Sequence, residues 1–122
     1  MMFFVDQEHE KEFKTFVRRY DKSGDKEYLA AYYVLTANDE LRRKAARYIK
    51  PDGIGWPRIW EQDWSSGYRL ILQLGESLFQ SSGEVEFAYG LRTWDDELFQ
   101  VAIEAVMLRR KGFLRLPKTM LA

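Results

Sequence analysis

The sequence predicts a mainly α-helical protein, in which residues 1–122 form one globular domain of five to six helices. Apolar residues recur at intervals of three and four along most of the chain, as they do on the buried faces of helices. Helix-capping residues precede several of these runs, and glycines follow them. With 46% hydrophobic residues and only three prolines, the chain has ample apolar surface for a core and few helix breakers.

The N-terminal half contains three predicted helices. The first begins after Asp6 as N-cap, and its apolar face carries Phe13, Phe16, Val17 and Tyr20. A turn at residues 22–25 leads into a second helix from Lys26 to about Ala37, which is apolar on several sides and is therefore expected near the centre. Asn38 caps a third helix over residues 39–49, and the Pro/Gly-containing run 50–55 ends it.

The C-terminal half contains two long predicted helices. One begins at Ser65 or Ser66 and closes at residues 81–83, with Gly75 on its inward face allowing a close helix approach. The other is capped by Asp95 and ends at Gly112. Because residues 98–108 are almost all apolar, we expect this last helix at the centre of the fold.

A minor β element is predicted between these two helices, near residues 84–90. Val85, Phe87 and Tyr89 alternate with polar or small residues, as in a short strand. Its candidate partners are the segments 3–5 and 113–116.

Three of the four tryptophans fall within nine positions: Trp56, Trp60 and Trp64. Their spacing of four would stack them on one helical face, and Pro57 is suited to the first turn of such a helix. Indoles favour core or interface positions, and three of them beside a chain break are unlikely all to be enclosed. The segment from Trp56 to Tyr68 is therefore predicted to be partly exposed.

This segment leads to the first functional hypothesis, a non-enzymatic protein-interaction or adaptor module that binds a protein partner or self-associates. Tryptophan, tyrosine and arginine are enriched in protein interfaces. The candidate partner-binding residues are Trp56, Arg58, Trp60, Trp64, Tyr68 and Arg69. The alternative is that these indoles only complete the core.

The second hypothesis is association with nucleic acid through a basic C-terminal segment. Its five cations lie within ten positions that contain no acid: Arg109, Arg110, Lys111, Arg115 and Lys118. A second cluster comprises Arg42, Arg43, Lys44 and Arg47, and the two together could hold phosphates if they converge in space. The 19 basic and 19 acidic residues cancel, which favours ordinary solvated helix surfaces instead.

A small enzyme or metal-binding protein is the third hypothesis. Asp6 and His9 could supply two metal ligands, but a site needs three or four, and His9 is the only histidine. Glu61 with Asp63, and the acids at 95–97, form close carboxylate groups whose capping and surface roles are the simpler explanation. We therefore assign no catalytic residue and expect neither a metal nor another cofactor.

Four stretches carry a resemblance to a family of small bacterial proteins catalogued as a domain of unknown function. They are residues 3–9, 52–56, 61–69 and 95–102, with Arg109 beyond the last. The resemblance implies a mainly helical, intracellular protein associated with mobile elements, and it brings no catalytic residues with it.

Composition completes these expectations. The chain has no cysteine, which fits a reducing cytoplasm. It has no apolar stretch approaching the roughly 20 residues that cross a bilayer. We expect a cytoplasmic protein that does not enter a membrane.

Overall fold

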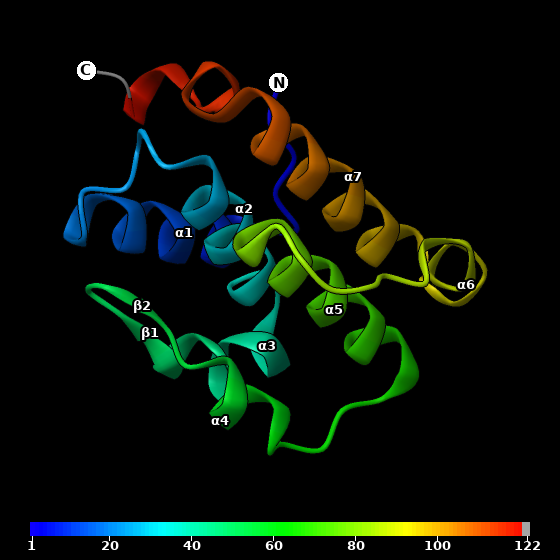
Figure 1. The fold of residues 1–122 in the computed structure, drawn as a ribbon. Coiled ribbons are helices and arrows are strands. Elements are labelled where there is room, and N and C mark those ends of the chain that lie inside the picture. The colour runs from blue at the N-terminus through cyan, green and yellow to red at the C-terminus, as the bar shows by residue number, and fades with distance from the viewer. Residues whose placement is uncertain (121–122) are drawn as a thin grey trace.

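The computed structural model describes residues 1–120 and is mainly helical, which confirms the predicted fold class (Figure 1). Within that range the α-helices are α1 (Gln7–Arg19), α2 (Lys26–Leu35), α3 (Asp39–Lys44), α4 (Trp56–Trp60), α5 (Ser66–Gln80), α6 (Phe87–Thr93) and α7 (Asp96–Lys111). Three short 3₁₀ helices are η1 (Ala46–Tyr48), η2 (Gly112–Arg115) and η3 (Lys118–Met120), and two short strands are β1 (Ile49–Lys50) and β2 (Gly53–Ile54).

Helix boundaries follow the predicted caps closely. The three capping side chains that accept a hydrogen bond from the backbone N–H three residues later are Asp6, Asn38 and Asp95, at 2.8, 3.0 and 2.8 Å. Gly112 ends α7 with a φ of 58°, in the left-handed region where glycine carries no steric penalty. These local signals therefore set where α1, α3 and α7 begin and where α7 stops.

Helix α2 lies at the centre of the fold, as predicted. It packs against α1, α3, α5, α7 and η2, and every residue from Leu29 to Leu35 has no exposed surface. Figure 1 shows it between α1 and the pair formed by α5 and α7. Where α5 crosses it, a Cβ on Gly75 would lie 3.2 Å from Val34, so this glycine does allow the predicted close approach.

The prediction that α7 is also central is wrong. One face of α7 packs on α2 and α5 through Val101, Ala102, Ala105 and Leu108, but Phe99, Ile103 and Val106 on the other face are 37–39% exposed. Figure 1 shows α7 along one edge of the molecule. A helix at the edge of the molecule buries only one of its faces. The nearly continuous run of apolar residues therefore did not mean that the whole helix is buried.

The small β element lies at residues 49–54, where β1 and β2 pair antiparallel with Ile49 opposite Ile54. The predicted strand near residues 84–90 is instead α6, packed on the ring of Trp94. Only glycine fits where the two meet, because a Cβ on Gly90 would lie 2.5 Å from that ring. The third predicted helix also ends early, at Lys44, and the chain continues through η1 and β1.

The first five residues, Met1–Val5, form an extended N-terminal strap along the C-terminal half of α7 (Figure 1). The Phe3 N–H donates to Glu104 Oε1 at 2.8 Å, and the Phe3 carbonyl accepts from the Tyr33 hydroxyl at 2.6 Å. Arg115 donates to both oxygens of Glu104 and to the Met1 carbonyl. Glu104 is 3% exposed, and its carboxylate is fully engaged by these donors.

Candidate interaction site

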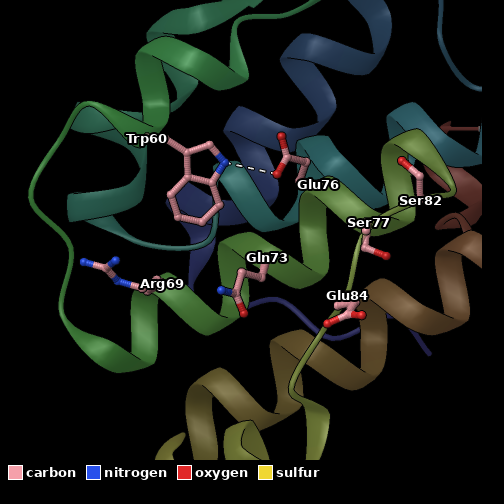
Figure 2. Close-up of a pocket in the computed structure, with 8 residues that line it drawn as sticks. Trp60, Arg69, Gln73, Glu76, Ser77, Ser82 and Glu84 are labelled. Carbon is pink, nitrogen blue, oxygen red and sulfur yellow. Dashed lines mark hydrogen bonds between the residues drawn. The ribbon is translucent and has the colours of Figure 1, made fainter.

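A pocket of about 350 Å³ opens between α4 and the outer face of α5. Trp60 comes from α4, and the loop that follows α5 supplies Ser82, Gly83 and Glu84. The α5 residues that line it follow one another at helical spacing: Arg69, Gln73, Glu76 and Ser77. Figure 2 shows Glu76 pointing toward Trp60, with Arg69, Gln73 and Ser77 along the same helix.

The polar side chains of this pocket differ in how far they are engaged within the fold. The Trp60 indole N–H donates to Glu76 Oε1 at 3.1 Å, which fixes the ring across the pocket (Figure 2). The amide oxygen of Gln73 is buried and has no hydrogen-bond partner among residues 1–120. Arg69 is exposed, and in the same part of the chain it forms no ion pair or side-chain hydrogen bond.

Two of the three clustered tryptophans belong to the core, so of the indoles in the segment predicted to be partly exposed only Trp60 contributes to its surface. Trp56 is 3% exposed and packs on Phe79, with ring centroids 6.0 Å apart. Trp64 is 8% exposed, and its indole N–H donates to the Ile59 carbonyl at 2.8 Å. Because α4 ends at Trp60, the spacing of four does not continue to Trp64 on one helix.

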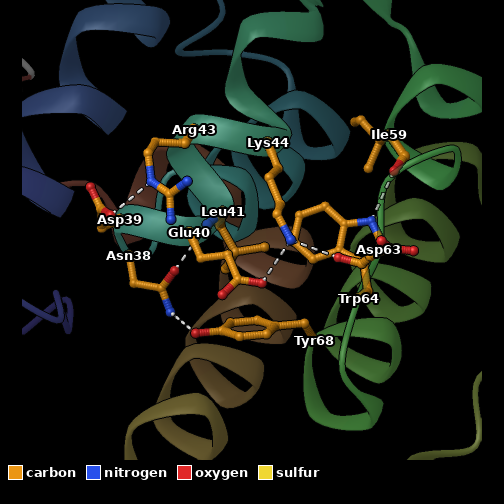
Figure 3. A network of polar contacts seen from close by, with 10 residues as sticks. All are labelled: Asn38, Asp39, Glu40, Leu41, Arg43, Lys44, Ile59, Asp63, Trp64 and Tyr68. Carbon is orange, nitrogen blue, oxygen red and sulfur yellow. Dashed lines mark hydrogen bonds and ion pairs between the residues drawn. The ribbon is translucent and has the colours of Figure 1, made fainter.

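Tyr68 and Trp64 help to fasten the segment after α4 to α3 (Figure 3). The Tyr68 hydroxyl accepts from Asn38 Nδ2 at 2.9 Å. Lys44 donates to Glu40 and to the Asp63 carbonyl, and its ammonium lies 5.0 Å from the Trp64 ring centroid. These predicted binding residues are therefore engaged within the fold.

Arg58 is exposed on α4 but lies outside the pocket. Of the six predicted partner-binding residues, the structure thus brings together Trp60 and Arg69 at one accessible pocket.

The basic C-terminal segment does not form one free cationic surface. Arg109 donates to the Leu78 carbonyl and to Ser81 Oγ, at 2.9 and 3.1 Å. Arg115 is held by Glu104. The remaining three, Arg110, Lys111 and Lys118, are exposed.

The second basic cluster is also largely paired, and it lies elsewhere. Arg43 pairs with Asp39 at 2.9 Å, Lys44 with Glu40 at 3.2 Å, and Arg42 donates to the Thr36 carbonyl. Figure 1 places α3 on the opposite side of α2 from the C-terminal end of α7, so the two clusters do not converge.

His9 is a buried structural residue with both ring nitrogens engaged. Nδ1 accepts from the Val5 N–H at 3.1 Å, so Nε2 carries the proton and donates to the Tyr33 carbonyl at 2.9 Å. Burial is the main cause that lowers the pKa of His9 to about 4, and the nearby charge of Arg42 acts in the same direction. In residues 1–120 no three histidine, aspartate or glutamate side chains are grouped as metal ligands would be.

Sequence reasoning missed Gln73, Glu76 and Glu84 as site residues. Gln73 and Glu76 stand four and seven positions after Arg69, so the helical spacing from that predicted residue could have found them. Glu84 reaches the pocket only because the chain turns back after α5 at Ser81, which adopts a left-handed conformation with φ 56°. The sequence predicts that the helix closes at residues 81–83, but it does not indicate the direction in which the chain continues.

Comparisons with known proteins add no relative. No family model, curated protein or solved structure matches the chain significantly. The resemblance to a bacterial family stays a prediction. Across the described residues, every helix is too short or too polar to cross a membrane.

Proposed function

We propose that the protein is an interaction module that binds a peptide segment of a partner protein in the pocket between α4 and α5. The observation that carries the proposal is the joint presence there of a half-buried indole and an exposed arginine that forms no ion pair within residues 1–120.

The chemistry of the pocket suits a polypeptide better than a ligand that carries charge of only one sign. Arg69 attracts a carboxylate, whereas Glu76 and Glu84 attract N–H donors or cations. The face of Trp60 offers apolar area to an aliphatic or aromatic side chain. A peptide that carries an acidic residue beside an apolar one, with its own backbone N–H groups, satisfies all three.

Selection from a random-peptide display library tests the proposal. Peptides enriched on the protein should carry an acidic residue near an aromatic or aliphatic one. Arg69→Glu should weaken their binding at least tenfold in a fluorescence-polarisation titration, because it replaces attraction of the carboxylate with repulsion. Arg69 is exposed and forms no ion pair within the described part of the chain, so this variant should keep the wild-type circular dichroism spectrum and melting temperature.

Lys11→Glu provides the matched control, since it makes the same charge change at an exposed residue of α1 away from the pocket. It should leave peptide affinity unchanged. Failure to enrich any peptide, or equal binding to the Arg69 and Lys11 variants, would contradict the proposal.

The remaining expectations stand as parts of this proposal. We place the protein in the cytoplasm, because a chain without cysteine suits a reducing compartment. Nucleic-acid binding stays the alternative, supported by the exposed Arg110, Lys111 and Lys118.

A further inference from the structure

The outer face of α7 carries an exposed apolar stripe. Phe99, Ile103 and Val106 are 37–39% exposed, and Met107 beside them is half-buried. Their spacing of four, three and one places them on one side of the helix, opposite the face that packs on α2 and α5. In Figure 1 this helix runs along the edge of the molecule.

The stripe has charges of opposite sign at its two ends. Asp96 and Arg110 each stand seven residues from Ile103, one before it and one after it. Seven residues are close to two helical turns, so both charges lie on the line of Ile103, about 10 Å away on either side. Both are exposed, and neither forms an ion pair within residues 1–120.

We infer that this face binds a second copy of the same chain, with the two α7 helices antiparallel about a two-fold axis at Ile103. In that arrangement residue 96 of each copy lies opposite residue 110 of the other, so two Asp96–Arg110 pairs form at the rim. Phe99 of each copy meets Met107 of its partner, and Ile103 meets its own copy. The surface is therefore self-complementary in charge and in apolar pattern, as an isologous dimer interface must be.

A second copy of the chain fits this face better than a partner whose charges are all of one sign. Nucleic acid or an anionic membrane would attract Arg110 but repel Asp96, and the adjacent Glu97 adds to that repulsion. An antiparallel copy satisfies both ends at once.

The small size of the surface indicates a transient dimer rather than an obligate one. A helix of 16 residues is about 24 Å long. A pair of them buries less than the ~1,600 Å² of a standard interface, even with the exposed Leu91 and Leu114 beyond the ends, so we expect a reversible dimer of micromolar Kd. The inference goes beyond the proposed peptide site, none of whose lining residues belongs to α7.

Charge exchange tests the arrangement by sedimentation equilibrium over a range of protein concentrations. Asp96→Arg alone and Arg110→Asp alone should each weaken self-association at least tenfold, because each sets like charges opposite one another at both rim positions. The double exchange D96R/R110D should return the Kd to within about threefold of wild type, because it restores opposite charges at both positions.

Mixing the two single variants gives the sharpest result. Each is impaired alone, but a heterodimer of the D96R and R110D chains has an arginine opposite an aspartate at both rim positions. The equimolar mixture should therefore dimerise at concentrations where neither component does. Both substituted residues are exposed, and circular dichroism checks that each variant is folded.

An introduced cysteine tests the position of the axis, since the chain has none of its own. Ile103→Cys should form a disulfide-linked dimer on mild oxidation. Asp96→Cys should not, because the two copies of residue 96 would stand about 20 Å apart along the antiparallel helices. A wild-type protein that stays monomeric up to several hundred micromolar would overturn the inference. Equal cross-linking at residues 96 and 103, or a charge exchange that fails to restore association, would also overturn it.

Discussion

Helix α2 is enclosed by five other elements, whereas α7 packs on its neighbours with one face and leaves the other open. Both helices are rich in apolar residues, but these residues have different surroundings. In α2 seven consecutive residues are fully buried, including both ring systems of Tyr32 and Tyr33. In α7 the apolar residues divide between the interior and the stripe centred on Ile103.

This difference separates two reasons for a helix to be apolar. Residues of α2 contribute to stability because they are removed from water in the monomer. The outer residues of α7 gain little from folding and can gain from association. Substitutions in the two helices should therefore affect different measurable quantities.

The largest expected effect is on stability, from truncation inside α2. Leu35→Ala removes a fully buried side chain and leaves a cavity, so it should lower the free energy of unfolding by about 3 kcal/mol. Ile103→Ala in α7 should lower it by less than about 1 kcal/mol, because that side chain is already 39% exposed. Urea titrations at protein concentrations low enough to keep the chain monomeric measure both values. Equal losses would remove the distinction between the two helices.

The next effect is a pH dependence that comes from a contact with α2. His9 is buried against the Tyr33 carbonyl, and its pKa falls from 6.5 to about 4. The unfolded chain binds a proton on this histidine below about pH 6.5, but the folded chain does not bind it until about pH 4. The contribution of neutral, buried His9 to the free energy of unfolding is therefore complete above pH 6.5. It declines as the pH falls, by about 3 kcal/mol in all by pH 4.

Urea titrations between pH 7 and 4 measure this contribution, with His9→Gln as the comparison. The two proteins have the same carboxylates. A difference between them in the slope of the free energy of unfolding against pH therefore comes from His9. Identical slopes for the two proteins would show that the histidine is protonated in the folded state or that the site opens readily.

The smallest expected effect distinguishes two glycines of α5, of which Gly75 faces α2 and Gly67 faces α7. A Cβ at position 75 would lie 3.2 Å from Val34 of α2, whereas one at position 67 would lie 3.6 Å from Leu98 of α7. Gly75→Ala should destabilise by about 1 kcal/mol, because overpacking exceeds the gain in helix propensity. Gly67→Ala should stabilise by ~0.5 kcal/mol, because it meets only ordinary contacts and restricts the unfolded chain. Thermal unfolding of the two variants gives the signs, and two changes of the same sign would contradict the contrast.

Local patterns predicted much of the fold. The caps at Asp6, Asn38 and Asp95 and the stop at Gly112 act within a few residues of the chain, so the sequence contains all that determines them. The setting of α6 depends on a tertiary contact as well, because the Trp94 ring beneath it is held on α5, where its indole N–H donates to the Gly67 carbonyl at 3.0 Å. The alternation of Val85, Phe87 and Tyr89 resembles a strand, but the packing of Gly90 on Trp94 accompanies a helix there.

The candidate site was predictable only in part for the same reason. Trp60 and Arg69 were identified from composition and neighbourhood in sequence. The burial of Trp56 depends on Phe79, which is 23 positions away, and that of Trp64 depends on contacts with α3. Arg115 looked like a free cation because its partner, Glu104, lies on the previous helix and is buried. Which segments meet is not encoded in any local spacing.

The N-terminal strap closes a long loop of the chain. Arg115 holds the Met1 carbonyl at 2.9 Å, so two residues 114 positions apart lie side by side. Because the entropic cost of closing a flexible loop rises by only about 0.6 kcal/mol per doubling of its length, this contact costs little more to form than one that closes a loop half as long.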